Sequence, residues 1–176
     1  MTTCEPCELP DSALLGKYRV AGAYTDCYAV DIARSVSHAE CVAAFYTTRA
    51  FKLERLLLAW FASKPSTDSQ ARALAAGDLD TFAAWHVEAR AADQLLLCDF
   101  QGRTRSWLMS ESPRADGFSG TRLLFGSAVV PVRNPRSGRS TTGWLFRALL
   151  GFHRLYSRVL LRAAAARLLE NLPAKP

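Results

Sequence analysis

One predicted β-hairpin combines acidic, basic and aromatic residues whose types and spacing could do chemistry. Asp99 precedes the turn of this hairpin, and Arg103, Arg105 and Trp107 follow it. Charged side chains on neighbouring antiparallel strands can pair across the ladder. An arginine at the mouth of a pocket can instead hold a carboxylate or phosphate through two parallel hydrogen bonds. The residues leave both interpretations open, an ion pair on the solvent face or an anion-binding site.

A histidine in the predicted last helix is the second candidate for chemistry. His153 could act as a general base if it faces a cavity, because the pKa of histidine lies near neutral pH. The alternative is a histidine that only packs or caps. His153 and Asp99 are therefore the candidate acid/base residues of an enzyme. No G-x-S-x-G, P-loop or G-x-G-x-x-G pattern accompanies them.

The five cysteines include a C-x-x-C pair, Cys4 and Cys7, near the N-terminus. A redox C-x-x-C normally begins a helix, where the helix dipole lowers the thiol pKa, but this pair lies in a proline-flanked segment. A structural zinc site needs two further ligands, and the sequence has no second C-x-x-C and no H-x-x-x-H. We therefore predict no metal site and no cofactor. Residues 1–16 are interpreted as a flexible tail and residues 17–172 as a single domain.

Composition and charge limit the class of protein. The 176 residues are 49% apolar and 22% charged, which is typical of a globular protein. Residues 1–99 have a net charge of −4, whereas residues 100–176 have a net charge of +10. The basic half could bind an acidic partner, or the acidic half could neutralise part of it within one domain.

Several partners are not predicted. The strongly apolar run Leu123–Val130 is far shorter than the roughly 20 residues that span a bilayer. The first residues have neither the basic segment nor the apolar core of a signal peptide, so we predict a cytoplasmic protein without a membrane span. The aromatic residues fall on core stripes rather than among exposed basic residues, so nucleic acid is not a predicted partner. A homodimer is left open.

Apolar periodicity and caps predict the elements that position these residues. A capping box of Ser37 and Glu40 begins a helix, and the last helix has a wide apolar stripe with Arg147, Arg154, Arg158 and Arg162 on its other side. Alternating apolar residues, and runs that are apolar on both faces, predict about five strands. The strands are expected over 28–32, 81–90, 94–100, 103–110 and 121–132, and further helices over 50–62, 68–76 and from about 142 to 169.

This order of elements resembles the helix-grip fold of the SRPBCC, or START-like, superfamily, in which a curved sheet wraps around the last helix. Three stretches, YTDCYAVDI, LLLCDFQGRTRSWL and GFHRLYSRVLLRAA, are similar to an uncharacterised bacterial family related to that superfamily. The resemblance covers about residues 24–168. None of these stretches is a known catalytic signature, and the chain has fewer readable strands than the full fold.

The resemblance implies an α+β helix-grip domain with a cavity between the sheet and the last helix, which holds a small apolar or amphipathic molecule. We therefore expect a small-molecule-binding protein. One alternative is an enzyme of the cyclase or dehydratase type that acts on a hydrophobic substrate. The other is a module that docks on anionic membranes or on proteins through its basic C-terminal half. The expected ligand-binding residues are Trp85, Trp107, Phe125, Leu149, Phe152 and Tyr156, with Arg103, Arg105 or Arg133 on an acidic head group.

Overall fold

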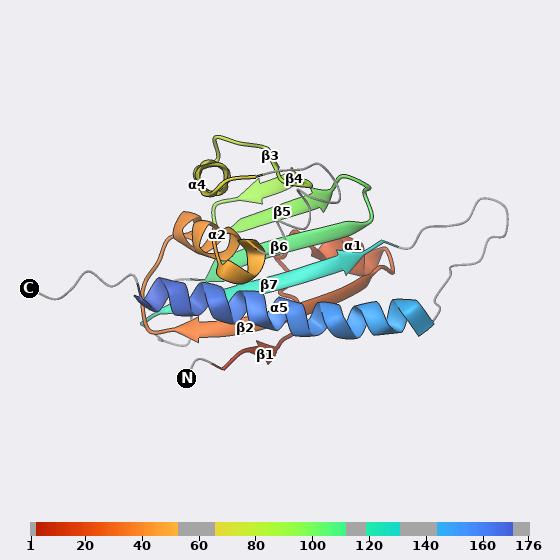
Figure 1. The fold of residues 1–176 in the computed structure, drawn as a ribbon. Helices are drawn as coiled ribbons and strands as arrows, with labels where there is room; N and C mark the ends of the chain where they lie inside the picture. The colour runs from red at the N-terminus through yellow and green to blue at the C-terminus, as the bar shows by residue number, and fades with distance from the viewer. Residues whose placement is uncertain (1–2, 53–65, 112–118, 131–143, 171–176) are drawn as a thin grey trace, which may run out of the picture.

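A computed structural model of the chain describes residues 3–52, 66–111, 119–130 and 144–170, and for 144–153 it describes the backbone alone. These residues form an α+β structure in which a seven-stranded antiparallel sheet carries a long C-terminal helix, α5 (Trp144–Glu170), along one face (Figure 1). The order of the strands across the sheet is β1-β2-β7-β6-β5-β4-β3. The strands are β1 (Glu5–Pro6), β2 (Tyr24–Ile32), β3 (Thr81–Phe82), β4 (Trp85–Ala91), β5 (Gln94–Asp99), β6 (Thr104–Glu111) and β7 (Thr121–Val129).

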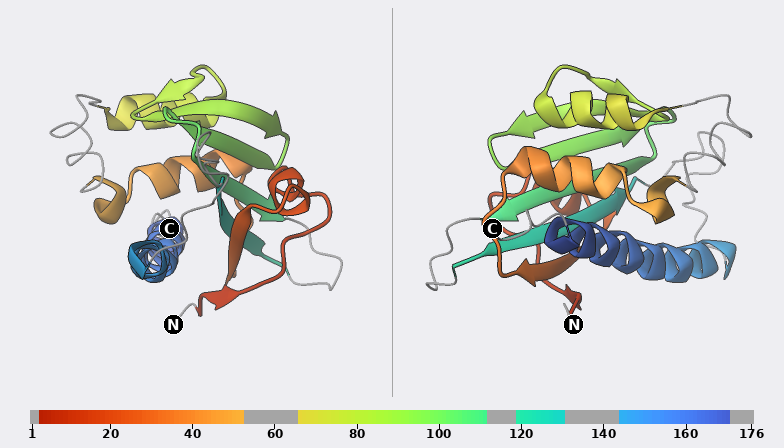
Figure 2. Two further views of the ribbon diagram at one scale, coloured as in Figure 1. Left: turned by 90° about the vertical axis from the view of Figure 1, so that its right-hand side faces the viewer. Right: turned by 60° about the vertical axis from the view of Figure 1, so that its left-hand side comes forward.

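Helices cover both faces of the sheet. The helices α2 (His38–Tyr46) and α4 (Asp68–Ala76) lie on the same face as α5, and the short helix α1 (Gly16–Val20) lies on the other (Figure 2). The sheet therefore separates two apolar cores. The helix-side core includes Val30, Ile32, Val42, Phe45, Leu74, Leu97, Leu123, Phe125, Leu161 and Ala165. The α1-side core consists of Leu9, Ala13, Leu15, Cys27, Ala29, Leu96, Trp107, Met109, Leu124 and Ala128.

An aromatic cluster forms the centre of the helix-side core. The ring of Phe45 on α2 lies 4.8 Å from Phe125 on β7 and 5.1 Å from Tyr46. Tyr46 in turn contacts Phe51 and Phe82, at ring separations of 4.8 and 5.5 Å. Large aromatic side chains contribute much of the apolar area that a core buries, and edge-on contacts add to it. This cluster holds α2 against the sheet.

The α1-side core is organised around Trp107, whose side chain is 0% exposed. Its indole Nε1 donates to the Gln94 side-chain oxygen at 2.9 Å, and the same oxygen accepts from the Leu14 amide. Directly across the ladder from Trp107 lies Gly126. A Cβ atom at Gly126 would lie 3.0 Å from the Trp107 ring and from Leu15, and 2.8 Å from the Asp26 carbonyl oxygen. The absence of a side chain at this position therefore lets the ring pack closely against β7.

The N-terminal segment differs from the flexible tail that the sequence predicted. β1 pairs with β2, with Glu5 opposite Ala29, and Leu9, Ala13 and Leu15 are buried. The reason is that the second face of the sheet is also apolar, and this segment covers it. The sequence pattern showed the apolar side chains on both faces of β7, but it did not show which segment would cover the second one.

The helix caps and most strand positions are confirmed. Ser37 and Glu40 form the predicted capping box, and α4 ends at Gly77, whose φ of 90° favours glycine. The strand expected over 81–90 is instead two strands, β3 and β4, joined by a turn at Ala83 with a φ of 54°. Most of the helix expected over 50–62 lies outside the described residues. Among the described residues, no helix combines the length and apolar character that crossing a bilayer requires.

We predict that Gly126→Ala lowers the free energy of unfolding by about 1–3 kcal/mol, because the added methyl group overpacks the contact between Trp107 and β7. The matched control is Gly16→Ala in α1. A Cβ atom at Gly16 meets nothing within 4 Å, so this variant should be unchanged or slightly more stable. Urea unfolding followed by tryptophan fluorescence measures both, and equal stabilities of the two variants would contradict the packing argument.

Candidate functional site

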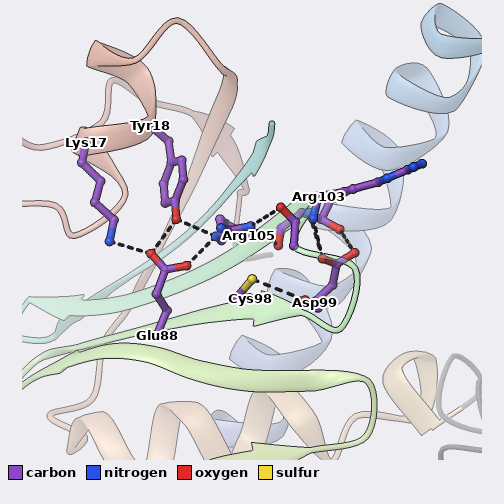
Figure 3. A network of polar contacts seen from close by, with 9 residues as sticks. Lys17, Tyr18, Glu88, Cys98, Asp99, Arg103 and Arg105 are labelled. Carbon is purple, nitrogen blue, oxygen red and sulfur yellow. Dashed lines mark hydrogen bonds and ion pairs between the residues drawn. The ribbon is translucent and has the colours of Figure 1, made fainter. Parts of the chain in front are cut away.

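Four side chains form a polar cluster on the α1 side of the sheet, here called the Glu88 cluster (Figure 3). It consists of Lys17 and Tyr18 from α1, Glu88 from β4 and Arg105 from β6. Arg105 Nε lies 2.5 Å from Glu88 Oε2 and donates to the Tyr18 hydroxyl at 2.7 Å. The hydroxyl and Lys17 Nζ each lie 2.5 Å from Glu88 Oε1. The Arg105 guanidinium also lies over the Tyr18 ring, at 4.6 Å from its centroid.

The contacts of the Glu88 cluster keep its charges in place. Burial raises the pKa of Glu88, but hydrogen bonds from Lys17, Tyr18 and Arg105 outweigh it, so the pKa lies below its ordinary value. The Arg105 side chain is only 12% exposed, and it also donates to the carbonyls of Gly102 and Thr104. Because its Nε and Nη1 donors are already engaged, we interpret Arg105 as a residue that ties α1 to the sheet.

Asp99, which the sequence offered as an ion-pair partner for Arg103 or Arg105 and as a candidate acid/base residue, closes the hairpin turn in the structure. Its carboxylate accepts from the Arg103 amide at 2.7 Å, and from the amide and hydroxyl of Thr104 at 3.2 and 2.8 Å. These bonds close the turn between β5 and β6. The side chain of Arg103 is exposed and points away from Asp99 (Figure 3). The three charged residues therefore do not converge on one anion-binding site.

The predicted ligand-binding residues are divided between the two faces of the sheet. Phe125 lies in the helix-side core, and Trp85 and Tyr156 pack against it. Trp107 belongs to the α1-side core, because alternation along β6 turns it to the opposite face from Leu108. These residues therefore do not line one cavity. The backbone of α5 includes Leu149, Phe152 and His153, whose side chains lie outside the described residues, as does Arg133.

A pocket opens on the helix side, between α2, α4 and the C-terminal end of α5. Its volume is about 220 Å³. Apolar side chains and a surplus of positive charge line it, because three arginines face one glutamate. The lining residues are Arg34, Glu40, Ala43, Ala44, Thr47, Arg72, Arg167 and Leu168.

Backbone carbonyls orient two of the pocket arginines. Arg34 donates to the Leu168 carbonyl at 2.5 Å and lies 3.3 Å from Glu40. Arg167 donates to the carbonyl of Thr47, the last residue of the α2 cap, at 3.1 Å. Arg72 on α4 is exposed. Hydrogen bonds from Ser37 lower the pKa of Glu40, so this residue is ionised at neutral pH and balances one of the three guanidinium charges.

Sequence reasoning singled out only Glu40 of these pocket residues, and only as a cap. The three arginines come from separate segments of the chain, so their spacing has no recognisable pattern. The signal that existed was the excess of arginine over acidic residues in the C-terminal half, to which Arg167 belongs.

A half-buried histidine, His38, lies at the start of α2. Its Nδ1 is 3.1 Å from the Ser110 hydroxyl oxygen, and its Nε2 is buried with no hydrogen-bond partner among the described residues. Burial lowers the pKa of His38 to about 4, with a smaller opposing effect of Asp93. At neutral pH the ring is therefore uncharged and packs between α2 and the sheet.

Comparisons of the chain with protein-family models, with curated proteins and with solved structures give no match. The resemblance to the SRPBCC superfamily therefore stays a prediction, and the site is interpreted from its geometry.

We predict that Glu88→Gln lowers the free energy of unfolding at pH 7 by about 1–3 kcal/mol. The reason is that Lys17 and Arg105 lose the carboxylate with which they form ion pairs. The pKa of Glu88 is lowered in the folded state. Its stabilisation is therefore present above the ordinary value of 4.5 and is lost as the pH falls through the lowered folded value. Urea unfolding at pH 7 and pH 3 measures this loss of stability.

The control for Glu88→Gln is Arg103→Gln, which should change stability by less than about 0.5 kcal/mol at both pH values. An equal loss for Glu88→Gln at both pH values would contradict the role of the charge.

We predict that protonation of His38 destabilises the fold in mild acid. The pKa of His38 falls from 6.5 to about 4 on folding, so the unfolded chain takes up the proton first, and stability declines as the pH falls from 6.5 towards 4. Between pH 7 and pH 5 the wild type should lose about 2 kcal/mol more than His38→Gln, which cannot take up the proton. Urea unfolding at the two pH values measures the difference. His86→Gln replaces an exposed histidine and should behave like the wild type; the same behaviour of His38→Gln would refute the prediction.

Proposed function

We propose that this protein binds a small amphipathic molecule with an acidic group, and that the pocket between α2, α4 and α5 holds it. The observation that carries the proposal is the combination of an apolar lining with three arginines in that pocket. Arginine holds a carboxylate or phosphate through two parallel hydrogen bonds.

The geometry of the pocket supports a small ligand. Ala43, Ala44 and Leu168 offer an apolar surface next to the guanidinium groups. Hydrogen bonds to backbone carbonyls hold Arg34 and Arg167 in place, which reduces the entropy that binding would cost. The volume of about 220 Å³ is below the roughly 300 Å³ at which pockets for drug-sized ligands begin. A carboxylate no larger than octanoate, or a comparable phosphate, is therefore the ligand class we propose.

The helix-grip fold is the finer architecture that we propose for this chain. The antiparallel sheet with α5 along one face is compatible with it (Figure 1). In the described part of the chain, however, buried aromatic rings such as Phe45 and Phe125 pack tightly between α2 and the sheet. We therefore propose a ligand site at the C-terminal end of α5, and not over the middle of the sheet as the resemblance implied.

A second candidate function, docking on an anionic surface, has one observation in its favour. On α5, Leu155 and Val159 are 63% and 45% exposed, and Arg162 follows on the same helix face at the spacing i, i+4, i+7. Basic and apolar residues on one helix face suit an anionic membrane. An enzymatic function has less support, because Asp99 is engaged in its hairpin turn.

Titration calorimetry with octanoate tests the pocket. We expect octanoate to bind and octanol to bind more weakly, because octanol lacks the charge. Arg72→Gln should weaken octanoate binding about ten-fold, the effect of losing one charge-assisted hydrogen bond. Ala43→Leu should abolish binding by filling the pocket without changing its charge. Arg103→Gln removes an equal charge far from the pocket and is the matched control.

Two results would count against the pocket. One is octanoate binding that is unchanged by both Arg72→Gln and Ala43→Leu, and the other is equal affinity for octanol. Sedimentation with phosphatidylserine vesicles distinguishes docking on an anionic surface from ligand binding in the pocket. Vesicle binding that Leu155→Ser abolishes and Arg72→Gln leaves intact would favour docking through α5.

A further inference from the structure

The short strand β1 brings two cysteines together that are 20 residues apart in the sequence, Cys7 and Cys27. The register pairs Pro6 with Tyr28, so the next residue, Cys7, lies opposite Cys27. The Cys7 amide donates to the Cys27 carbonyl at 3.0 Å, and the two sulfur atoms are also 3.0 Å apart. Opposed residues of an antiparallel pair have Cα atoms about 4.5–5.5 Å apart, within the range of about 4.4–6.8 Å that a disulfide accepts. A bond between the two sulfurs therefore requires little backbone movement.

The structure separates the two cysteines of the C-x-x-C motif. Cys4 is buried in the helix-side core, where Arg162 and Arg158 are its charged neighbours. Cys7 packs against the α1-side core, together with Cys27. The two thiols of the motif thus lie on opposite faces of the sheet edge. The partner that the fold gives to Cys7 is Cys27.

The two sulfurs differ in exposure and in acidity. Cys7 is half-buried, whereas Cys27 is buried. The hydrogen bond between the two thiols lowers the pKa of Cys7, against the opposing effect of burial, and the nearby Arg122 lowers it further. The same hydrogen bond, together with burial, raises the pKa of Cys27. A partly exposed thiol with a lowered pKa next to a buried thiol with a raised pKa is the arrangement of an attacking and a resolving cysteine.

We propose that Cys7 and Cys27 form a redox site, which a hydroperoxide oxidises to a disulfide that fastens the N-terminal segment to the sheet. A metal site is not an alternative, because the described residues contain no group of three or more His, Cys, Asp or Glu that could hold an ion. The proposal is independent of the pocket, which lies on the other face of the sheet.

The reaction proceeds in two steps. The Cys7 thiolate attacks the hydroperoxide, the O–O bond breaks, and the released alkoxide takes a proton to leave as an alcohol; Cys7 becomes a sulfenic acid. The Cys27 sulfur then attacks the Cys7 sulfur, the S–O bond breaks, and the departing hydroxide takes the Cys27 proton to leave as water. In sum, two thiols and one hydroperoxide give one disulfide, one alcohol and one water. A dithiol such as dithiothreitol reverses the oxidation by exchange.

The disulfide would close the chain segment from Cys7 to Cys27, which contains α1 and the buried Leu15. Closing such a loop restricts the unfolded chain and stabilises the fold. It would also hold the cover of the α1-side core in place, including Tyr18 of the Glu88 cluster. Oxidation is therefore expected to raise the melting temperature of the protein.

The test is a peptide map of the full chain after treatment with hydrogen peroxide and alkylation of the remaining thiols. The expected result is a linked peptide that contains Cys7 and Cys27, with a higher melting temperature that dithiothreitol reverses. In Cys27→Ser the reaction should stop at a sulfenic acid on Cys7, which dimedone labels. Cys98→Ser removes a buried thiol elsewhere on the sheet and is the matched control; it should form the same linked peptide as the wild type.

Three results would overturn the proposal: a Cys4–Cys7 link, a link between two chains in place of the internal one, or oxidation of Cys7 no faster than that of Cys98. The wild-type map decides between Cys4 and Cys27 even if a variant fails to fold. A competition between iodoacetamide alkylation of Cys7 and of Cys4 in the reduced wild type adds a second measurement. Cys7 should react at least ten-fold faster than the buried Cys4, and equal rates would count against it as the attacking thiol.

Discussion

The sheet is apolar on both faces, and the rest of the structure depends on covering each of them. Along β7, Leu123 and Phe125 face the helices, whereas Leu124 and Ala128 face α1. An antiparallel sheet with one polar face could leave that face to water, but this one cannot. The helices α2, α4 and α5 cover the first face, and the N-terminal segment with α1 covers the second. At Gly126 the second cover lies close to the sheet, because a Cβ atom there would be 3.0 Å from Leu15.

Because both faces are covered, the charged clusters lie where a helix meets the sheet or where helices meet each other. The Glu88 cluster joins α1 to β4 and β6, and the pocket arginines cap the ends of α2 and α5. Arginine has different roles in the two places. The guanidinium of Arg105 contacts a carboxylate, a hydroxyl and two carbonyls, so we interpret its role as holding α1 against the sheet. Around the pocket, three guanidinium groups face one carboxylate, and the surplus charge is what a small anion would meet.

Local signals predicted the elements that depend on neighbouring residues. The capping box of Ser37, the αL stop at Gly77, the alternation within β2 and the apolar run of β7 are set by residues a few positions apart. Two strands were missed because β1 and β3 have only two residues each, too few for alternation to show. The face of Trp107 and the partner of Arg105 were also missed. Both depend on which strand lies alongside, and that is a property of the whole sheet.

The cysteines show the same limit most clearly. Spacing groups Cys4 with Cys7, since a C-x-x-C is what a sequence pattern can detect, but three residues of extended chain turn the two side chains to opposite faces. The ladder between β1 and β2 groups Cys7 with Cys27 instead. The reactivity that we propose follows the second grouping, because the hydrogen bond that lowers the pKa of Cys7 acts between atoms in contact. The C-x-x-C spacing alone therefore does not show which thiol lies next to Cys7. The strand register does, and it places Cys27 there, a residue outside the motif.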